Sequence, residues 1–174
     1  LGTTAVLADK WDAEVAVDTL QKERCTHMAG ATPFLQQLLA AAQRAGTRLP
    51  HLKVFICGGA SVPPSLIRNA AAHFDQTIFT RVYGSTEVPV TTVGVPTRDD
   101  LTHAAETDGR VGFGEVRLVS TQSAEGASGD SEGEIRARGP QMLIGYLHAE
   151  DEAAVFDEQG FYRAGDLGRW VDKS

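Results

Sequence analysis

Residues 53–87 read KVFICGGASVPPSLIRNAAAHFDQTIFTRVYGSTE, and this stretch decides the fold. Residues 53–57 and 77–83 are short runs rich in β-branched and aromatic side chains, which favour strands. Residues 64–73 between them carry apolar side chains at helical spacing. A strand, a helix and a strand with short connections form a right-handed parallel βαβ unit in ~98% of cases. The stretch therefore predicts an α/β fold with a mostly parallel sheet and flanking helices.

Two loops leave the same edge of this predicted sheet. Gly58, Gly59 and Ala60 follow the first strand, and residues 84–87 (GSTE) follow the second. Open α/β sheets bind ligands at the carboxyl edge of their parallel strands. We therefore expect the two loops to lie side by side there, with room for a planar base between them.

The segment before residue 53 continues the alternation of strands and helices. Residues 4–8 (TAVLA) and 25–30 (CTHMAG) predict strands. Asp12 is expected to cap one helix, and Thr32 is expected to cap a second helix that has Pro33 in its first turn. The predicted buried faces are Val15, Ala16, Thr19 and Leu20 in the first helix, Phe34, Leu35, Leu38, Leu39 and Ala42 in the second, and Leu66, Ile67, Ala70 and Phe74 in the third.

The second half of the chain has shorter, more closely spaced strand patterns. A polar connector, residues 96–109, precedes them, and the Ser-, Gly- and acid-rich residues 120–134 predict an exposed hairpin loop. This pattern favours a small antiparallel barrel-like subdomain. We expect residues 1–95 to form the α/β subdomain and residues 96–174 the β subdomain. The predicted strands are 110–120, 133–139, 161–164 and 166–171.

The composition excludes two functional classes. The 174 residues carry a formal charge of −7, whereas nucleic-acid surfaces need clustered Lys and Arg, so we expect no nucleic-acid partner. No segment approaches the ~18 apolar residues of a membrane span. Cys25 and Cys57 lack CxxC spacing and are expected to be reduced thiols in a cytoplasmic protein, and the histidines show no zinc-ligand spacing. The chain does not begin with Met, which suggests a piece of a larger protein of unspecified oligomeric state.

The residues after each strand have two interpretations. In the first interpretation, Gly58 and Gly59 serve only to turn the chain, and residues 83–87 (YGSTE) are an ordinary strand end with capping hydroxyls. Alternatively, Tyr83 offers a flat face to a base, Gly84 admits a close ligand, Thr86 donates to a phosphate and Glu87 holds Mg²⁺. Asp166, between two predicted strands, is either a turn residue or the acceptor for both hydroxyls of a ribose.

The motifs GGAS, VYGSTE, GEIRARGPQMLIGYL and GFYRAGDLGRW, in this order, resemble the adenylate-forming superfamily. This superfamily includes acyl-CoA synthetases, aryl-CoA ligases, luciferases and the adenylation domains of peptide synthetases. The resemblance spans nearly the whole chain and implies part of the large N-terminal domain. It also implies a reaction in which a carboxylic acid and ATP give acyl-AMP, from which CoA then displaces AMP.

The resemblance also assigns roles to residues. Gly58, Gly59 and Ala60 would line the adenine, on which Tyr83 would stack. Gly84 and Ser85 belong to the same nucleotide loop. Thr86 would contact the α-phosphate, Glu87 would bind Mg²⁺ and Asp166 would bind the ribose. Thr86 and Glu87 would be the catalytic residues. The path of the acyl group would pass Ser85, Val88 and Pro89.

Details of the motifs favour one branch of the superfamily. GGAS has Ala60 where amino-acid-activating domains usually have Glu, and GEIRARGPQMLIGY has the CoA-ligase form. The chain is therefore similar to bacterial acyl-CoA ligases of fatty acid and lipid metabolism, while an amino-acid-adenylating domain and a non-catalytic nucleotide-binding or interaction module stay open. Arg81 stands where the family often has Gln or Asn at the adenine amine. A Ser/Thr/Gly-rich P-loop with its Lys is absent from the sequence, so we expect the isolated chain to be inactive.

Overall fold

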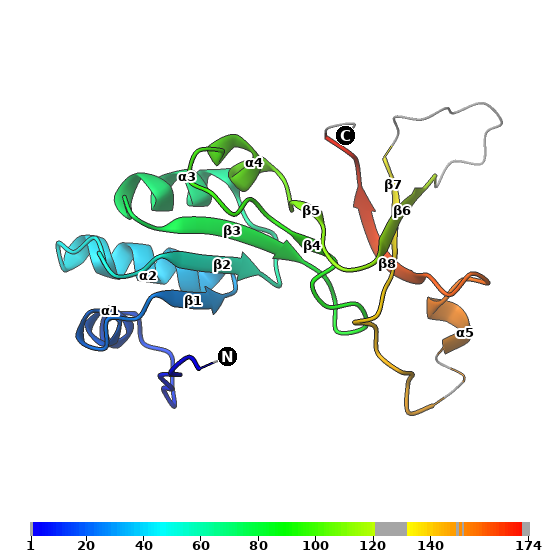
Figure 1. The fold of residues 1–174 in the computed structure, drawn as a ribbon, viewed down its shortest axis with the longest axis horizontal. Helices are drawn as coiled ribbons and strands as arrows, with labels where there is room; N and C mark the ends of the chain where they lie inside the picture. The colour runs from blue at the N-terminus through cyan, green and yellow to red at the C-terminus, as the bar shows by residue number, and fades with distance from the viewer. Residues whose placement is uncertain (1, 121–131, 149, 151, 172–174) are drawn as a thin grey trace. The chain divides into compact units, whose positions relative to one another are not determined.

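The computed structural model has the mixed α/β fold that the sequence predicts (Figure 1). A mostly parallel five-stranded sheet has the order β1-β2-β3-β4-β5, and an antiparallel three-stranded sheet has the order β6-β7-β8. The described residues are 2–120, 132–148, 150 and 152–171. The elements are α1 (Ala13–Lys22), β1 (His27–Gly30), α2 (Thr32–Arg44), β2 (Val54–Gly58), α3 (Pro64–His73), β3 (Ile78–Tyr83), β4 (Thr92–Val93), α4 (Leu101–Glu106), β5 (Arg110–Val111), β6 (Glu115–Val119), β7 (Gly133–Arg138), α5 (Glu152–Val155) and β8 (Tyr162–Gly168).

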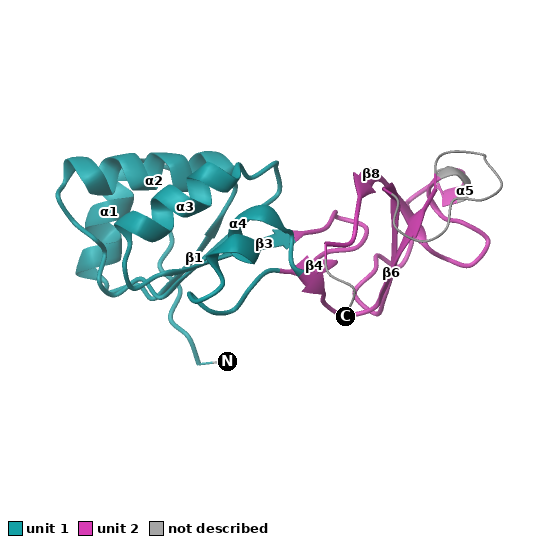
Figure 2. Ribbon diagram, turned by 90° about the horizontal axis from the view of Figure 1, so that it is seen from above, with its two compact units in different colours: residues 1–82, 94–109 teal, residues 83–93, 110–174 magenta. Residues whose placement is uncertain are grey.

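The chain forms two compact units, which Figure 2 shows in different colours. Unit 1 comprises Leu1–Val82 and Gly94–Gly109, and unit 2 comprises Tyr83–Val93 and Arg110–Ser174. Each unit therefore contains two separate segments of the chain. In the part of the chain that the structure describes, every helix is too short or too polar to cross a bilayer.

Strands β1, β2 and β3 form the parallel part of the sheet. Val54 of β2 pairs with Ile78 of β3, and helices α2 and α3 connect the strands as two successive βαβ units. Along β2, Phe55 and Cys57 are 0% exposed, whereas Ile56 between them is 37% exposed. Because side chains alternate between the two faces of a strand, one face of β2 is fully covered and the other is not.

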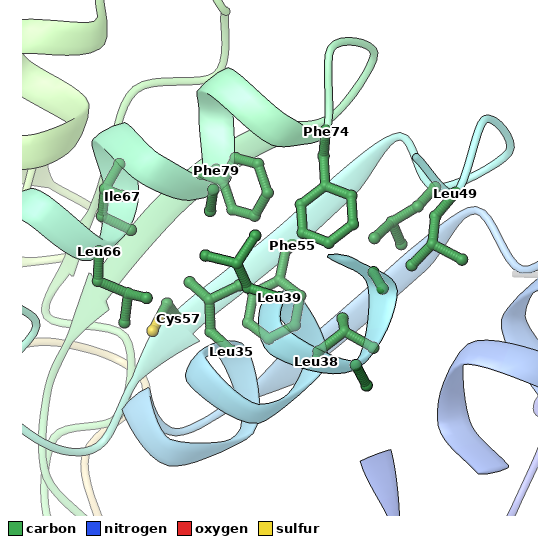
Figure 3. Packing of buried hydrophobic residues seen from close by; sticks show 14 of the residues in the cluster. Leu35, Leu38, Leu39, Leu49, Phe55, Cys57, Leu66, Ile67, Phe74 and Phe79 are labelled. Carbon is green, nitrogen blue, oxygen red and sulfur yellow. The ribbon is translucent and has the colours of Figure 1, made fainter. Parts of the chain in front are cut away.

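The hydrophobic core of unit 1 lies on the covered face (Figure 3). Leu35 and Leu38 of α2 and Ile67 of α3 are each 0% exposed. The rings of Phe55 and Phe79 stack with their centroids 6.2 Å apart. Burying one such side chain stabilises the folded state by ~1.5–3 kcal/mol. This core is therefore the main source of stability in unit 1.

The predicted starts of α1 and α2 had different outcomes. Asp12 caps α1 as predicted, because its Oδ1 accepts a hydrogen bond from the backbone N–H of Val15 at 3.0 Å. The prediction that Thr32 caps α2 is wrong. Ala31 is the N-cap, and the Thr32 hydroxyl instead donates to the carbonyl of Ser61 at 2.9 Å. Thr32 therefore links the start of α2 to the turn before α3.

The predicted buried face of α3 is confirmed, and so is that of α2 except for Phe34, which is half-buried with its ring against Trp11. The predicted face of α1 needs more correction. Val15 is 56% exposed, whereas Val17 is 1% exposed. The two positions are about 200° apart around the helix axis, so they cannot share one face. The side chains of α1 that are buried are Ala13, Val17 and Leu20.

Three other predictions for segments also need comment. Residues 4–8 form no strand, and all five are exposed. Residues 96–109 contain α4, which Asp100 caps by accepting from the N–H of His103 at 3.1 Å. The central residues 121–131 of the predicted hairpin loop lie outside the described residues.

The antiparallel sheet of unit 2 confirms a β-rich second half, with different strand limits. Residues 110–120 divide into β5 and β6 at Gly114, where a Cβ would collide with the carbonyl of Arg138. The two strands predicted at 161–164 and 166–171 are instead one strand, β8.

Strand β8 contains a bulge at the point where two strands were predicted to meet. Arg136 of β7 pairs with Arg163, but Glu134 pairs with Leu167, so three residues of β8 lie opposite one residue of β7. Gly165 within this bulge has a φ of 72°. A positive φ favours glycine, and a bulge redirects the side chains beside it. The prediction that Asp166 lies in a turn between strands is therefore wrong: Asp166 lies in the bulge of β8.

Candidate functional site

The fold of unit 1 requires Gly58, the last residue of β2, and favours glycine at Gly59, the first residue after it. A Cβ on Gly58 would lie 2.5 Å from the carbonyl oxygen of Val82, so only glycine allows β2 and β3 to pair there. Gly59 has a φ of 78° with open space where a Cβ would be, and Ala60 is exposed. Gly58 thus serves strand packing, and Gly59 serves the turn.

The register of β2 and β3 gives the starting points of the two predicted loops. Gly58 pairs with Val82 in parallel, so Gly59 and Tyr83 are the next residues of two neighbouring strands that run in the same direction. The predicted common edge is confirmed at the level of strand pairing. A slit for a planar base between the loops stays a prediction.

The loop after β3 is a tight turn within unit 2. The backbone N–H of Val88 donates to the Ser85 hydroxyl at 3.2 Å, and that of Ser85 donates to the Val88 carbonyl at 3.3 Å. A Cβ on Gly84 would lie 2.7 Å from the backbone nitrogen of Val90. The loop's own backbone therefore requires glycine at this position. Val88 is buried, whereas Thr86 is exposed at the tip of the loop.

Tyr83 and Asp166 meet in unit 2, although they belong to different motifs. The Tyr83 hydroxyl donates a hydrogen bond to Oδ2 of Asp166 at 2.8 Å. Tyr83 is half-buried, whereas Asp166 is exposed. The bulge of β8 thus presents an accessible carboxylate beside an aromatic ring.

The side chain of Glu87 is held by hydroxyl donors. Its Oε1 accepts a hydrogen bond from the Tyr146 hydroxyl at 2.8 Å. This bond is the main reason that the pKa of Glu87 is lowered, with smaller contributions from the hydroxyls of Ser85 and Tyr162. Burial raises the pKa of the Tyr162 hydroxyl, and the negative charge of Glu87 raises it further. Glu87 is therefore a carboxylate in an environment that favours its ionised form.

Sequence reasoning identified Glu87 but missed Tyr146 and Tyr162. Both tyrosines lie inside quoted motifs, GEIRARGPQMLIGYL and GFYRAGDLGRW, but neither position has a local pattern that indicates a partner. Their proximity to Glu87 arises from tertiary folding, because Tyr146 is 59 residues away in the chain.

The surroundings of Glu87 fit a site for a divalent cation that also binds phosphate. Among the described residues, no basic side chain forms an ion pair with Glu87, so its charge is not neutralised. Over the same residues, no group of three or more His, Cys, Asp or Glu side chains could form a metal cage. Mg²⁺ usually binds one or two carboxylates and completes its coordination with water and substrate phosphates. The chemistry of Glu87 fits that pattern.

Arg81, at the position expected to face the adenine amine, has protein partners within unit 1. Its guanidinium donates to the carbonyl of Ala105 at 2.9 Å and forms an ion pair with Asp108 at 2.7 Å. The side chain is 11% exposed. These contacts link β3 to the segment around α4. Arg81 therefore has a structural role here.

The parallel sheet with flanking helices and the small antiparallel sheet together define a mixed α/β protein. The chain belongs to the family of AMP-binding enzymes, because the model of that family matches residues 1–147.

Relatives with known activities cover the chain almost completely. It is 34% identical over 171 residues to the medium-chain fatty-acid–CoA ligase of Escherichia coli, covering 97% of this chain and 30% of that protein. It is 28% identical over 178 residues to the indoleacetate–CoA ligase of Aromatoleum aromaticum, covering 98% of this chain and 34% of that protein. The chain thus spans about a third of the length of these relatives.

Solved structures support the fold. The luciferase-like enzyme of the nonluminescent mealworm Zophobas morio is similar with a TM-score of 0.81 and 21% identity, over 94% of this chain and 39% of that one. A long-chain-fatty-acid–CoA ligase from Archaeoglobus fulgidus is similar with a TM-score of 0.73 and 25% identity, over 91% of this chain and 34% of that one.

Proposed function

We propose that this chain is the nucleotide-binding part of an ATP-dependent carboxylic acid:CoA ligase that forms an acyl-AMP intermediate. The observation that carries the proposal is the hydrogen bond between Tyr83 and Asp166, which brings together in one unit two motifs that we propose bind the nucleotide. Membership of the AMP-binding family and the similarity to CoA ligases support it.

In the proposed site, each residue performs one task on the nucleotide. Tyr83 stacks on the adenine, beside Gly58, Gly59 and Ala60. Asp166 accepts hydrogen bonds from the ribose hydroxyls. Together these contacts fix the position of the α-phosphate, and fixing a reactant in this way can remove a large part of a reaction barrier.

The loop residues act on the phosphates. The exposed hydroxyl of Thr86 donates to the α-phosphate, and Glu87 holds the cation. A bound Mg²⁺ would neutralise phosphate charge and polarise the phosphoryl oxygens. In the first step, a carboxylate oxygen of the acid bonds to the α-phosphorus as the bond to pyrophosphate breaks. In the second step, the CoA thiolate bonds to the acyl carbon, and AMP leaves.

The acid is proposed only as a class. Relatives include ligases named for medium-chain fatty acids and for indoleacetate, so we propose a fatty, alicyclic or aryl acid for this chain. A role in fatty acid and lipid metabolism and a cytoplasmic location belong to the same proposal. One methylene changes the discrimination of a pocket by only ~1–3 kcal/mol, so substrate identity needs direct measurement.

A screen of non-hydrolysable acyl-sulfamoyl-adenosine analogues tests the proposal. The protein is the longest natural polypeptide that contains this chain, and the measurement is the rise in its melting temperature. We expect at least one fatty, alicyclic or aryl analogue to raise it and aminoacyl analogues to have no effect. If only aminoacyl analogues bind, the protein is an amino-acid-adenylating enzyme; if none binds, the ligase proposal fails.

A further inference from the structure

Tyr146 is fixed at both its hydroxyl and its backbone. The hydroxyl donates to Oε1 of Glu87 at 2.8 Å, and the backbone N–H donates to Oε1 of Glu152 at 3.1 Å. Gly145 allows this approach, since a Cβ there would lie 2.6 Å from the same Glu152 oxygen. Tyr146 therefore contacts one carboxylate through its hydroxyl and a second through its backbone.

The same segment also holds the backbone of Glu87. The N–H of Leu143 donates to the Glu87 carbonyl at 2.9 Å, and the N–H of Met142 closes a turn onto the Gly139 carbonyl at 3.2 Å. The loop between β7 and α5 thus binds Glu87 through both its main chain and its side chain. This arrangement restrains both the backbone and the carboxylate of Glu87.

Tyr162 supports the carboxylate from a rigid strand. It begins β8, pairs with Ala137 of β7 and forms a bridge to Phe156, whose ring centroid is 5.9 Å from its own. The negative charge of Glu87 raises the pKa of the Tyr162 hydroxyl, and that hydroxyl in turn helps to lower the pKa of Glu87. A strand gives a more precise base for such a donor than a loop does.

The chemistry of these donors is suited to a carboxylate that has to bind a cation. An Arg or Lys partner would orient Glu87 but would also neutralise its charge. The phenol hydroxyls of Tyr146 and Tyr162 orient it and leave the negative charge in place. Carboxylates that ligate metals are usually oriented by such outer hydrogen bonds, and loss of one typically lowers metal affinity about 10–100-fold.

We propose that Tyr146 and Tyr162 are positioning residues that hold the Glu87 carboxylate ready for the cation of a metal–nucleotide complex. The inference rests on the proposed function and adds two residues to its machinery. They act through Glu87 and contact neither the nucleotide nor the acid.

The test uses Mn²⁺ as the probe for the cation and the longest natural polypeptide that contains this chain. Tyr146→Phe and Tyr162→Phe each remove one hydroxyl and keep the ring. We expect each variant to bind Mn²⁺–ATP about 10–100-fold more weakly than the wild type. We expect binding of AMP without metal to change less than twofold, because the adenine and ribose contacts stay intact.

Two further variants show whether the tyrosines act through Glu87. Glu87→Gln should by itself weaken Mn²⁺–ATP binding. The double variant Glu87→Gln, Tyr146→Phe should bind little more weakly than Glu87→Gln, because the free-energy effects of two residues that act through one contact do not add. Thr107→Val in unit 1 is the control; it removes a hydroxyl that donates to the His103 carbonyl at 2.9 Å and should leave both affinities unchanged. Melting temperatures identify any variant that does not fold.

The outcomes separate this inference from the proposed function. Wild-type protein that binds neither AMP nor Mn²⁺–ATP overturns both. Wild-type binding of both ligands, with unchanged affinities in folded tyrosine variants, overturns only the positioning role. Equal losses for AMP and Mn²⁺–ATP would also overturn it, because they would indicate a general change in the unit.

Discussion

The Tyr83 hydroxyl donates a hydrogen bond to Oδ2 of Asp166 at 2.8 Å, across 83 residues of sequence. Tyr83 ends β3, and Asp166 lies in the bulge of β8. The bond joins the two segments whose residues are proposed to contact the base and the sugar of one nucleotide. It therefore gives the most direct route to testing the site by mutation.

Asp166→Ala should weaken AMP binding roughly 10–100-fold in the longest natural polypeptide that contains this chain, because hydrogen bonds to a charged group are worth ~1.5–3 kcal/mol. The affinity for 2′,3′-dideoxy-AMP, which lacks both ribose hydroxyls, should differ less than twofold between wild type and variant. Isothermal titration calorimetry measures both values. A comparable loss for the two ligands would show that Asp166 does not bind the ribose.

Tyr83→Phe and Tyr83→Ala separate the ring from the hydroxyl. Stacking of a base on an aromatic ring is worth ~1–3 kcal/mol, so the alanine variant should bind AMP about 5–100-fold more weakly. The phenylalanine variant keeps the stack and should lose much less affinity. Fluorescence titration with an adenine nucleotide can compare the two. If the phenylalanine variant is as weak as the alanine variant, the hydroxyl and not the ring is the important group.

Alanine substitutions at the two glycines should have unequal effects on stability. Gly58→Ala places a Cβ 2.5 Å from the Val82 carbonyl oxygen, which forces β2 and β3 apart, so we expect a loss of about 3 kcal/mol. The Cβ of Gly59→Ala would lie in open space, so its only cost comes from the positive φ of 78°, and we expect a loss of stability of about 1–2 kcal/mol. Urea denaturation of the 174-residue chain gives both values. Equal losses would contradict the steric explanation for Gly58.

Asp157 should make the stability of unit 2 depend on pH. Its pKa is lowered mainly by the hydrogen bond from the backbone N–H of Phe161 and also by Arg136, which it contacts at 3.0 Å. Since the folded pKa lies below the unfolded value of about 4, this stabilisation is present above that value and disappears as the pH falls through the folded pKa.

The corresponding variant is Asp157→Asn, with Asp99→Asn at an exposed position as its control. Asp157→Asn should lower the unfolding midpoint in denaturant at neutral pH, and the difference from wild type should shrink as the pH falls below about 4. Asp99→Asn should change the midpoint little at either pH. A difference for Asp157→Asn that is independent of pH would mean that its charge is unimportant.

The isolated 174-residue chain should form no acyl-CoA. Its sequence contains no Ser/Thr/Gly-rich P-loop with a Lys, so no basic side chain identified in it would contact the β- and γ-phosphates that leave as pyrophosphate. Chromatography of reactions with ATP, CoA, Mg²⁺ and a panel of carboxylic acids provides the measurement. Turnover of any acid by this chain would disprove the prediction.

Local patterns were sufficient for the elements around residues 53–87. The predicted helix at 64–73 has the same limits as α3, and the predicted strands agree with β2 and β3 to within one residue. Apolar periodicity succeeded here because these elements bury a continuous face in the core of unit 1. It failed at residues 4–8, which are mostly apolar but lie exposed outside any strand.

The sequence by itself determined the βαβ units, the common edge of β2 and β3 and the identity of the candidate residues, because chain direction and side-chain type follow from local order. Only the tertiary structure decided that Asp166 lies in a bulge beside Tyr83 and that the Tyr146 hydroxyl donates to Glu87. The bond between Tyr146 and Glu87 spans 59 residues of sequence, and the bond between Tyr83 and Asp166 spans 83. Local patterns cannot encode such contacts, because they form only when the strands and loops of unit 2 bring distant side chains together.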